Sequence, residues 1–255
     1  MTENFLEITS LGADYGENNT KTQVLNNVSL NLAKSKIGVL IGPSGCGKST
    51  LLNIIAGLKK EFQGTVLIDG KAPAYYPHTA LILQDYGLLP WKTVWENVIL
   101  GLKIKKMPQA IIADKAKQIL DQLGLYKLAS RYPSQLSGGQ RQRIAIARSL
   151  VLEPQLLLMD EPFSSLDALT REEMQQLLLE IWQKTKLTIL LVTHNIEEAV
   201  YLGQDIFLMT ALPGAVKEKL CNKIASGKGA RETAEFLELV NYIRSSLHEV
   251  QNDGF

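Results

Sequence analysis

The chain has 255 residues, 45% of them hydrophobic, which is enough to bury a real core in one large domain or two small ones. Lysine and arginine number 27 against 26 aspartates and glutamates, and this balance argues against a chain-wide basic surface for nucleic acid. The two cysteines, Cys46 and Cys221, do not make a disulfide framework and favour a reducing, cytoplasmic setting.

The sequence predicts no secretory or membrane-spanning segment. The first residues lack the basic start and the long apolar run of a signal peptide. No segment approaches the roughly 18 uninterrupted apolar residues that cross a bilayer. Any membrane role is therefore expected to come through a partner.

The first part of the chain predicts strands. Residues 5–8 and 23–32 alternate partly between apolar and polar side chains, with a polar turn at 15–19 between them. Residues 64–70 predict another strand, which an Asp-Gly turn closes. Tyr15, beside the first turn, could stack on an adenine ring because an aromatic face suits a purine, or it could simply pack on the surface.

Residues 42–49, Gly-Pro-Ser-Gly-Cys-Gly-Lys-Ser, fit the pattern G-x-x-x-x-G-K-[ST] of a phosphate-binding loop. An apolar strand is predicted before this loop at 37–41, and an apolar helix that a glycine ends is predicted after it at 50–57. The alternative is a chance glycine turn before a core helix, but it leaves the lysine, the serine and both flanks unexplained.

Each residue type in the phosphate loop has a physical role. Gly42, Gly45 and Gly47 let the backbone curl so that several N–H groups point at one anion, and the following helix aims its positive end at the same place. Lys48 reaches the β- and γ-phosphates, and the hydroxyl of Ser49 can ligate Mg²⁺. The cysteine of the loop is expected to contribute only its backbone.

Two interpretations stay open for the segment that follows. Residues 80–83 predict a short buried strand that delivers Gln84 to its end, where ligand groups collect in open α/β sheets. Gln84 could touch Mg²⁺ or orient a water, or it could merely end the strand. Residues 87–95 are unusually apolar and aromatic, with Trp91 and Trp95, and either pack inward or form a docking surface for another protein.

Residues 94–102 and 108–123 predict helices, the second of which Gly124 stops. Ser137 is a natural N-cap for a further helix that continues through the apolar residues 144–150. The two glycines after this serine leave N–H groups open to an anion. The segment is therefore either a second phosphate-type site or a capped helix with basic residues in solvent.

A continuous apolar run at 156–159 ends in Asp160 and Glu161. Buried strands do not normally end in adjacent acids without a cation or a reacting group nearby. Asp160 fits the shell of a Mg²⁺ ion, through a water, and Glu161, which points a different way, can polarise an attacking water. The alternative is a pair of acids that caps a helix.

The second half predicts a polar turn at 164–167, a helix at 171–185 and a buried strand at 187–192. The strand leads to His194, which could hydrogen-bond a γ-phosphate or the water, or could be structural. Asn195 is expected to cap the helix that follows.

Two further expectations concern the last part of the chain. Residues 232–250 predict a helix that packs through one face, made of Phe236, Val240, Ile243 and Leu247. The Gly-Lys-Gly segment at 227–229 lacks a preceding apolar strand and predicts a loop.

A specific series emerges when the motifs are taken in chain order: Tyr15, residues 42–49, Gln84, Leu136-Ser137-Gly138-Gly139-Gln140, Asp160-Glu161, residues 164–167 and His194. This series resembles the ATP-binding subunit of an ABC transporter over about residues 5–215. The phosphate loop is shared with many NTPases, whereas the Leu-Ser-Gly-Gly-Gln segment between that loop and the acid pair is highly specific.

The resemblance implies an α/β fold with a P-loop NTPase (RecA-like) core, an antiparallel β subdomain and an inserted α-helical subdomain at about 86–150. It implies a single nucleotide-binding domain over 1–255, with a C-terminal packing helix at about 232–250. ATP and Mg²⁺ are the implied ligands. Two copies are implied to pair head-to-tail, so that the helix start at 137–140 of one caps the γ-phosphate held by Lys48 of the other.

The resemblance also assigns residues to roles. The implied ATP-binding residues are Tyr15, Gly42, Pro43, Ser44, Gly45, Cys46, Gly47, Lys48, Ser49, Thr50, Gln84, Ser137, Gly138, Gly139 and Gln140. The implied metal-binding residues are Ser49, Gln84 and Asp160, and the implied catalytic residues are Glu161 and His194.

Residues 84–91 and 94–98 are most similar to importers of the nitrate, sulfonate and taurine type, although the Arg-Pro-Gly-Arg-Ile-like turn common in that group is replaced at 211–216 by a turn without arginine. This implies uptake of a small organic or inorganic anion through separate transmembrane permease subunits. The chain would lie peripherally on the cytoplasmic face of the inner membrane, with an extracytoplasmic solute-binding protein as an indirect partner and no nucleic acid. The alternatives are a soluble ABC ATPase that clamps nucleic acid or ribosomes, and the ATPase of an exporter.

Overall fold

The strands fall into two sheets in the computed structural model, which describes residues 4–16, 21–224 and 229–252. The larger sheet has the order β5-β6-β7-β3-β8-β9. Its strands are β3 (Ile37–Ile41), β5 (Thr79–Ile82), β6 (Leu156–Asp160), β7 (Thr188–Thr193), β8 (Asp205–Met209) and β9 (Val216–Cys221). All pairings are parallel except that of β9 with β8, so the carboxyl ends of five neighbouring strands lie along one edge.

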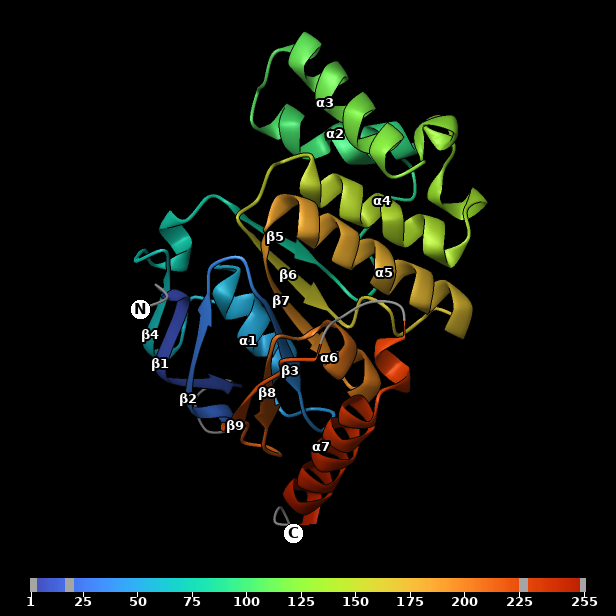
Figure 1. The fold of residues 1–255 in the computed structure, drawn as a ribbon. Helices are drawn as coiled ribbons and strands as arrows, with labels where there is room; N and C mark the ends of the chain where they lie inside the picture. Colours follow the sequence, from blue (N-terminus) through green and yellow to red (C-terminus); the bar gives the residue numbers. More distant parts are fainter. Residues whose placement is uncertain (1–3, 17–20, 225–228, 253–255) are drawn as a thin grey trace.

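The smaller sheet is antiparallel and has three strands in the order β2-β1-β4. They are β1 (Asn4–Tyr15), β2 (Thr22–Ala33) and β4 (Gln63–Ile68). Figure 1 shows this sheet at the lower left, beside the larger one. Its first strand extends to Tyr15, well beyond the predicted residues 5–8, because the pairing with β2 continues through several register shifts.

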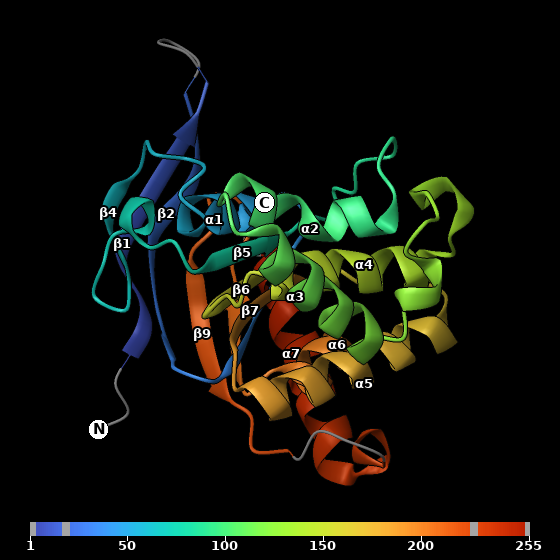
Figure 2. The same cartoon turned by 90° about the horizontal axis from the view of Figure 1, so that it is seen from above.

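The larger sheet is buried on both faces because successive side chains of its strands point in opposite directions. In β6, Leu156 and Leu158 join a cluster with the small sheet and helix α1 (Lys48–Ile55), whereas Leu157 and Met159 join a second cluster with the other helices. Figure 2 shows the small sheet and α1 on one side of the parallel strands and α5, α6 and α7 on the other. The continuous apolar runs in the sequence therefore reflect two-sided burial.

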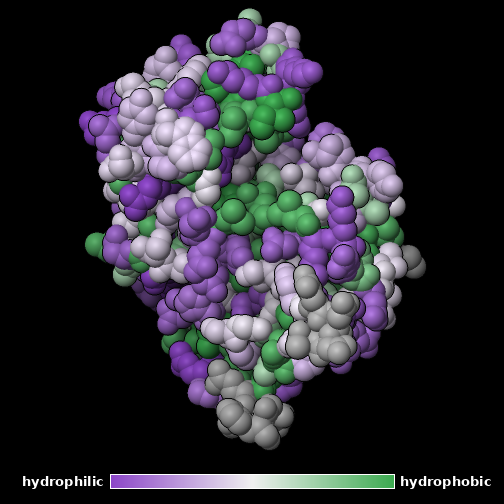
Figure 3. Space-filling view, turned by 180° about the vertical axis from the view of Figure 1, so that it is seen from behind, coloured by the Kyte–Doolittle hydropathy of each residue, from purple (hydrophilic) through white to green (hydrophobic). Residues whose placement is uncertain are grey.

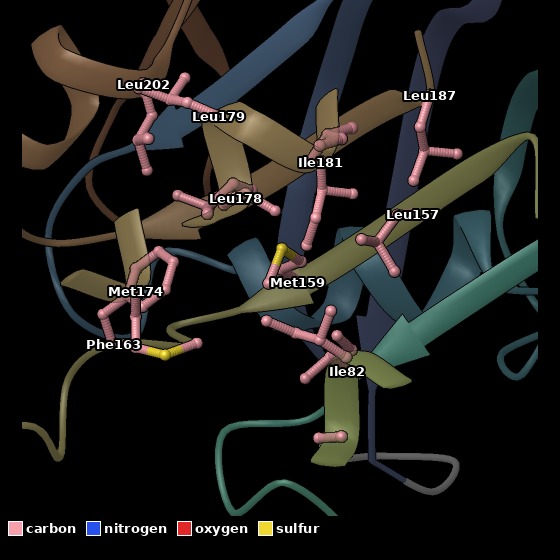
Figure 4. Packing of buried hydrophobic residues seen from close by; sticks show 14 of the residues in the cluster. Ile82, Leu157, Met159, Phe163, Met174, Leu178, Leu179, Ile181, Leu187 and Leu202 are labelled. Carbon is pink, nitrogen blue, oxygen red and sulfur yellow. The ribbon is translucent and has the colours of Figure 1, made fainter. Parts of the chain in front are cut away.

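Helix α5 (Ala168–Thr185) contributes several residues to the second cluster. Figure 4 shows Met174 and Leu178 of this helix in the same cluster as Leu157 and Met159. Burial of each such side chain contributes roughly 1.5–3 kcal/mol relative to exposure. This packing fixes the strand ends that carry the polar groups of the candidate site.

The remaining helices are α2 (Val94–Ile104), α3 (Gln109–Gln122), α4 (Gly138–Leu150), α6 (Ile196–Leu202) and α7 (Ala234–Asn252). Short 3₁₀ turns occur at Pro73–Tyr75, Tyr126–Leu128, Pro133–Gln135 and Ala230–Glu232. Figure 1 shows α2, α3 and α4 gathered at one end of the molecule and α7 at the other. None of the helices in the described residues is both long and apolar enough to cross a bilayer.

The helix starts follow from their caps. The predicted caps Ser137 and Asn195 each accept a hydrogen bond from a first-turn N–H group, at 3.3 Å and 3.0 Å, so both predictions are confirmed. Helix α5 begins three residues before the predicted Arg171, because Asp167 caps it by accepting from Thr170 N at 3.0 Å. The predicted stop at Gly124 is confirmed by its left-handed φ of 67°.

Two predicted segments lie partly outside the described residues. They are the polar turn at 15–19, of which 17–19 are not described, and the Gly-Lys-Gly segment, of which only Gly229 is described. In the C-terminal helix, Phe236, Val240 and Ile243 are buried and Leu247 packs against the same cluster.

Candidate active site

The phosphate loop turns tightly from the end of β3 into α1. Gly45 and Gly47 have φ values of 78° and 97°, in the left-handed region that glycine adopts without strain. A Cβ at Gly47 would lie 2.7 Å from Leu25 Cδ2, whereas a Cβ at Gly45 would meet nothing within 4 Å. Packing therefore requires glycine at position 47, whereas position 45 faces open space beside the helix start, where an anion is favoured.

Lys48 holds its ammonium against the loop itself. Its side chain is buried, and Nζ donates to the carbonyl oxygens of Gly42 at 2.9 Å and Pro43 at 2.7 Å. The thiol of Cys46 lies 3.6 Å from the same nitrogen. One positive charge is thus fixed within the loop, next to the helix N-terminus.

The expectation that Cys46 contributes only its backbone is wrong. Its side chain is fully buried, and a Cβ at Gly42 would lie 3.2 Å from its sulfur. Burial raises the pKa of the Cys46 thiol, although the nearby Lys48 opposes this, so the thiol stays neutral and packs as a small apolar group.

A cavity of about 250 Å³ opens beside the loop. Its walls are Tyr15, Val24, Ser44, Gly45, Gly47, Lys48, Ser49, Thr50 and Glu161. Tyr15 reaches it from the end of β1 and is 46% exposed, with the ammonium of Lys59 4.4 Å from the centre of its ring. The structure therefore brings an aromatic ring, the anion-binding loop and a carboxylate around one space.

Asp160 ends β6 and approaches the loop from the neighbouring part of the sheet. Burial raises the pKa of its carboxyl group, while a hydrogen bond from Ser49 and the charge of Lys48 oppose the shift. Ser49 and Asp160 together offer a hydroxyl and a carboxylate oxygen, which are the hard donors that Mg²⁺ prefers. A cation at this point would also relieve the partly buried negative charge.

Glu161 links three strand ends. Its Oε2 accepts a hydrogen bond from Gln84 Nε2 at 3.3 Å and lies 3.2 Å from His194 Nδ1. Gln84 follows β5, Glu161 follows β6 and His194 follows β7, and these strands are neighbours in the sheet. The sheet order thus gathers three residues that are far apart in the sequence, as expected for the carboxyl edge of parallel strands.

The backbone of Glu161 is unusual. Its φ is 44°, in the left-handed region, and its N–H donates to the carbonyl of Val192 on β7 at 3.0 Å. A left-handed non-glycine residue costs of order 1 kcal/mol or more and is found preferentially at functional sites. The turn directs the carboxylate out of the strand, where its side chain is 23% exposed.

The segment at 137–140 forms the start of α4 and does not line the cavity beside the phosphate loop. Ser137 and Gln140 form reciprocal hydrogen bonds at the start of α4, at 3.3 Å and 3.1 Å. A Cβ at Gly139 would lie 2.6 Å from Thr170 Cγ2, so this glycine lets α4 approach the start of α5 closely. None of these residues lines the cavity beside the phosphate loop, so the described chain does not bring the two anion sites together.

A larger cavity, of about 440 Å³, opens at the opposite edge of the sheet, where β6 and β7 begin. The last residues of α3, α4 and α5 line it, together with Lys34, Lys115 and Lys186. Lys186 directly follows α5, where a positive charge balances the negative end of the helix dipole. Lys115 is also paired with Glu153. None of the candidate site residues reaches this cavity.

A family profile described as "ABC transporter" matches residues 25–164, more than half of the chain. The chain belongs to the ABC transporter family. Among curated proteins of this family, the taurine import ATP-binding protein TauB of Escherichia coli O157:H7 is 41% identical over 98% of this chain and 99% of its own length. An uncharacterized ABC transporter ATP-binding protein of Methanocaldococcus jannaschii is 42% identical over 96% of this chain and 91% of its own.

Solved ABC structures have the same fold. The ATP-binding cassette MJ0796, a dimer in a post-hydrolysis state bound to ADP and Pi, superposes with a TM-score of 0.75 at 32% identity, over 86% of this chain and 99% of that one. CbiO1 from Clostridium perfringens, part of the ABC transporter complex cbiONQ, gives 0.78 at 26% identity over 97% of both chains. The predicted family and fold class, a P-loop NTPase core with added sheet and helices, are confirmed. The chain is an ATP-binding ABC ATPase.

Sequence reasoning missed several residues around the site of this ABC ATPase. Val24 lines the cavity and Lys59 lies over Tyr15, but neither belongs to a motif that would single it out. Tyr86, two residues after Gln84, places its hydroxyl 2.6 Å from Ser165 Oγ, in the polar turn after the acid pair. Only the closeness of Tyr86 to Gln84 in the sequence could have drawn attention to it.

Proposed function

We propose that this ABC ATPase is the ATP-binding subunit of an importer and that it hydrolyses ATP to drive uptake of a small anion, such as taurine, another sulfonate or nitrate, through separate membrane subunits. The observation that carries the proposal is the similarity to taurine import ATP-binding proteins over nearly the whole length of both chains, at 40–41% identity in Escherichia coli. The arrangement of the strand ends supports the chemistry.

In this proposal the phosphate loop, residues 42–50, holds the phosphates of ATP and Tyr15 stacks on the adenine. Ser49, Gln84 and Asp160 hold Mg²⁺, since Ser49 and Asp160 already lie together and the buried carboxylate favours a cation. When bound, the ion neutralises part of the phosphate charge. The residues of this chain do the remaining work of orienting the nucleotide.

Glu161 is the proposed general base. Its carboxylate lies at the wall of the cavity beside the loop, within reach of a water next to a terminal phosphate. His194 and Gln84 contact the same carboxylate oxygen and hold it in place. His194, which is 57% exposed, is further proposed to hydrogen-bond the γ-phosphate.

The site is proposed to be completed by a second copy of the chain, paired head-to-tail. The start of α4, residues 137–140, has N–H groups suited to an anion but lies away from the loop of its own chain. Dimeric cassettes among the similar structures support this arrangement. Residues 1–255 then act as one nucleotide-binding domain, with a helical subdomain at about 86–150 and a C-terminal packing helix at about 232–250.

The proposed membrane contact lies on the loop after Gln84. Trp91 on this loop is 70% exposed, and Leu83, just before Gln84, is 44% exposed. Figure 3 shows hydrophobic residues gathered on the face turned away in Figure 1, near the end with α2 and α3 and across the middle. We propose that a permease subunit docks on the loop with Trp91, so that the chain lies on the cytoplasmic face of the inner membrane. A solute-binding protein would then take part only indirectly.

The proposed function can be tested by transport. The chain would be reconstituted in vesicles with its membrane subunits and its solute-binding protein. ATP would be supplied on the side of the vesicle membrane where this subunit lies. We expect ATP-dependent uptake of one of three labelled anions, taurine, another sulfonate or nitrate. Uptake of none of them would remove the substrate class. ATP-dependent efflux would point to an exporter. Co-sedimentation with ribosomes or DNA instead of membranes would point to a soluble ABC ATPase that clamps nucleic acid or ribosomes.

A further inference from the structure

The loop that carries His194 lies beside a buried carboxylate, that of Glu198. Thr193 Oγ1 accepts from the N–H of Asn195 at 3.0 Å, and Asn195 Oδ1 accepts from the N–H of Glu198 at 3.0 Å. Glu198, which is 4% exposed, lines one small cavity together with Thr193, His194 and Asn195. The position of His194 therefore depends on where Glu198 is fixed.

Glu198 takes a second hydrogen bond from helix α5. Gln175 Nε2 donates to Glu198 Oε2 at 3.0 Å, and Gln175 is itself only 1% exposed. An amide side chain can turn over and exchange its donor for its acceptor. In the turned orientation the amide oxygen of Gln175 would face the Glu198 carboxylate and repel it. The hydrogen bond is therefore stable only if a donor binds Gln175 Oε1 and keeps the amide from turning.

Arg231 is the donor that binds the amide oxygen of Gln175. Its guanidinium donates to Gln175 Oε1 and to Glu172 Oε1, and it lies 4.3 Å from the centre of the Tyr201 ring. A carbonyl oxygen bound by a guanidinium cannot turn away without leaving donors unpaired. Arg231 belongs to the 3₁₀ turn Ala230–Glu232 that precedes α7, and Figure 1 shows this turn beside α6.

We infer that Arg231 is a positioning residue for His194, acting through Gln175, Glu198 and Thr193. The C-terminal segment thereby takes part in setting the rate of ATP hydrolysis, in addition to packing on the core. The inference rests on the role proposed above for His194. Arg231 does not line the cavity beside the phosphate loop, so its loss should change turnover and leave nucleotide affinity unaffected.

The test compares Arg231→Gln with Glu249→Gln in the full chain. Glu249 is 69% exposed and joins the same C-terminal region to β9 through an ion pair with Lys217, so it controls for a general loosening of α7. We expect Arg231→Gln to lower kcat by roughly 2- to 30-fold with an unchanged KM for ATP, the range expected for coupling through a packed network. Glu249→Gln should leave both parameters unchanged.

The deciding measurement repeats the substitution in a His194→Ala background. If Arg231 acts through His194, adding Arg231→Gln there should cause no further loss. An equal fold loss in both backgrounds, an unchanged kcat in the parent background, or the same loss in Glu249→Gln would overturn the inference. Parent-like turnover of His194→Ala alone would remove the proposed role of His194, and the inference with it.

A second variant and a second measurement guard against simple misfolding. Arg231→Lys keeps a positive charge beside Glu172 but loses the fork that holds Gln175, so it should fold and show the same kcat loss. Hydrogen–deuterium exchange should be faster at residues 193–199 in both Arg231 variants than in Glu249→Gln. Unchanged exchange at 193–199 would contradict the inference.

Discussion

Among single residues, Glu161 is the point where the most contacts of the candidate site meet. One of its carboxylate oxygens contacts both Gln84 and His194, while its backbone is tied to β7. A carboxylate fixed in this way is oriented before any water arrives, which is what a general base requires. Its environment therefore supports a chemical role better than a structural one.

Replacing Glu161 by glutamine tests that role. The amide keeps the size and the hydrogen-bonding reach of the side chain but cannot take up a proton. We expect turnover to fall by roughly 10²–10⁴-fold with ATP binding retained. Single-turnover kinetics and size-exclusion chromatography would follow hydrolysis and the expected accumulation of a nucleotide-bound dimer. Turnover near the parent rate would remove Glu161 from the role of base.

Asp160 gives a prediction that depends on pH. Burial raises the pKa of its carboxyl above the ordinary value of 3.8, so the folded state prefers the protonated form and the ionised form at neutral pH costs stability. Without Mg²⁺ and nucleotide, Asp160→Asn should therefore melt at a higher temperature than the parent at pH 7. The difference should shrink as pH falls through the raised pKa towards 3.8. A parent that melts higher at pH 7 would contradict this argument.

Among the elements, the loop after β5 carries an unusual backbone. Tyr86 and Gly87 are both left-handed, with φ values of 64° and 56°. Arg148 of α4 donates to both of their carbonyl oxygens, at 2.8 Å and 2.5 Å. The loop after Gln84 is thus held in shape by α4, the helix that Ser137 caps, so this helix connects the Gln84 loop to the candidate anion site at residues 137–140.

Arg148→Met should break this connection. The change keeps the length and apolar stem but removes both donors, and leaving buried carbonyls unpaired typically costs about 1–3 kcal/mol. We expect a lower midpoint of urea unfolding and a lower kcat. Arg143→Met is the matched control on the same helix, because Arg143 only approaches Glu173 at 3.7 Å near the surface. Equal effects of the two substitutions would argue against a specific role of Arg148.

The sequence predicted the elements that local patterns define. The phosphate loop, the capped helix at Ser137 and the apolar strand before Asp160 follow from turn chemistry, capping and burial within short windows. Contacts between distant residues could not be predicted in this way. Arg231 and Gln175 are 56 residues apart, and nothing in either local pattern reveals that they meet. The buried side chain of Cys46 was missed because motif chemistry describes only what a loop presents to its ligand.

At the scale of the whole molecule, the candidate nucleotide-binding residues lie along one edge of the larger sheet. The order β5-β6-β7-β3 places Gln84, the acid pair, His194 and the phosphate loop side by side. The start of α4 and the loop with Trp91 lie outside this row. These are the two surfaces that we propose bind a second copy of the chain and a membrane subunit.

Trp91→Glu tests the second surface. A charge in place of an indole that is 70% exposed should have little effect on folding but should oppose burial in an apolar interface. We expect co-purification with the membrane subunits to fall at least tenfold, about 1.4 kcal/mol, while basal ATPase activity persists. The matched control is Tyr75→Glu, at a site that is 80% exposed. Trp182→Phe would not serve, because that indole donates a hydrogen bond to the Ser35 carbonyl. Intact co-purification of Trp91→Glu would count against docking at this loop.

The left-handed turn at Glu161 also limits how this protein can be engineered. Glycine is the residue that such a backbone accepts most easily, yet it would remove the carboxylate together with the conformational cost. If Glu161 is the general base, as proposed, stability and turnover favour different residues at this position. Variants selected only for thermal stability should tend to lose ATP hydrolysis.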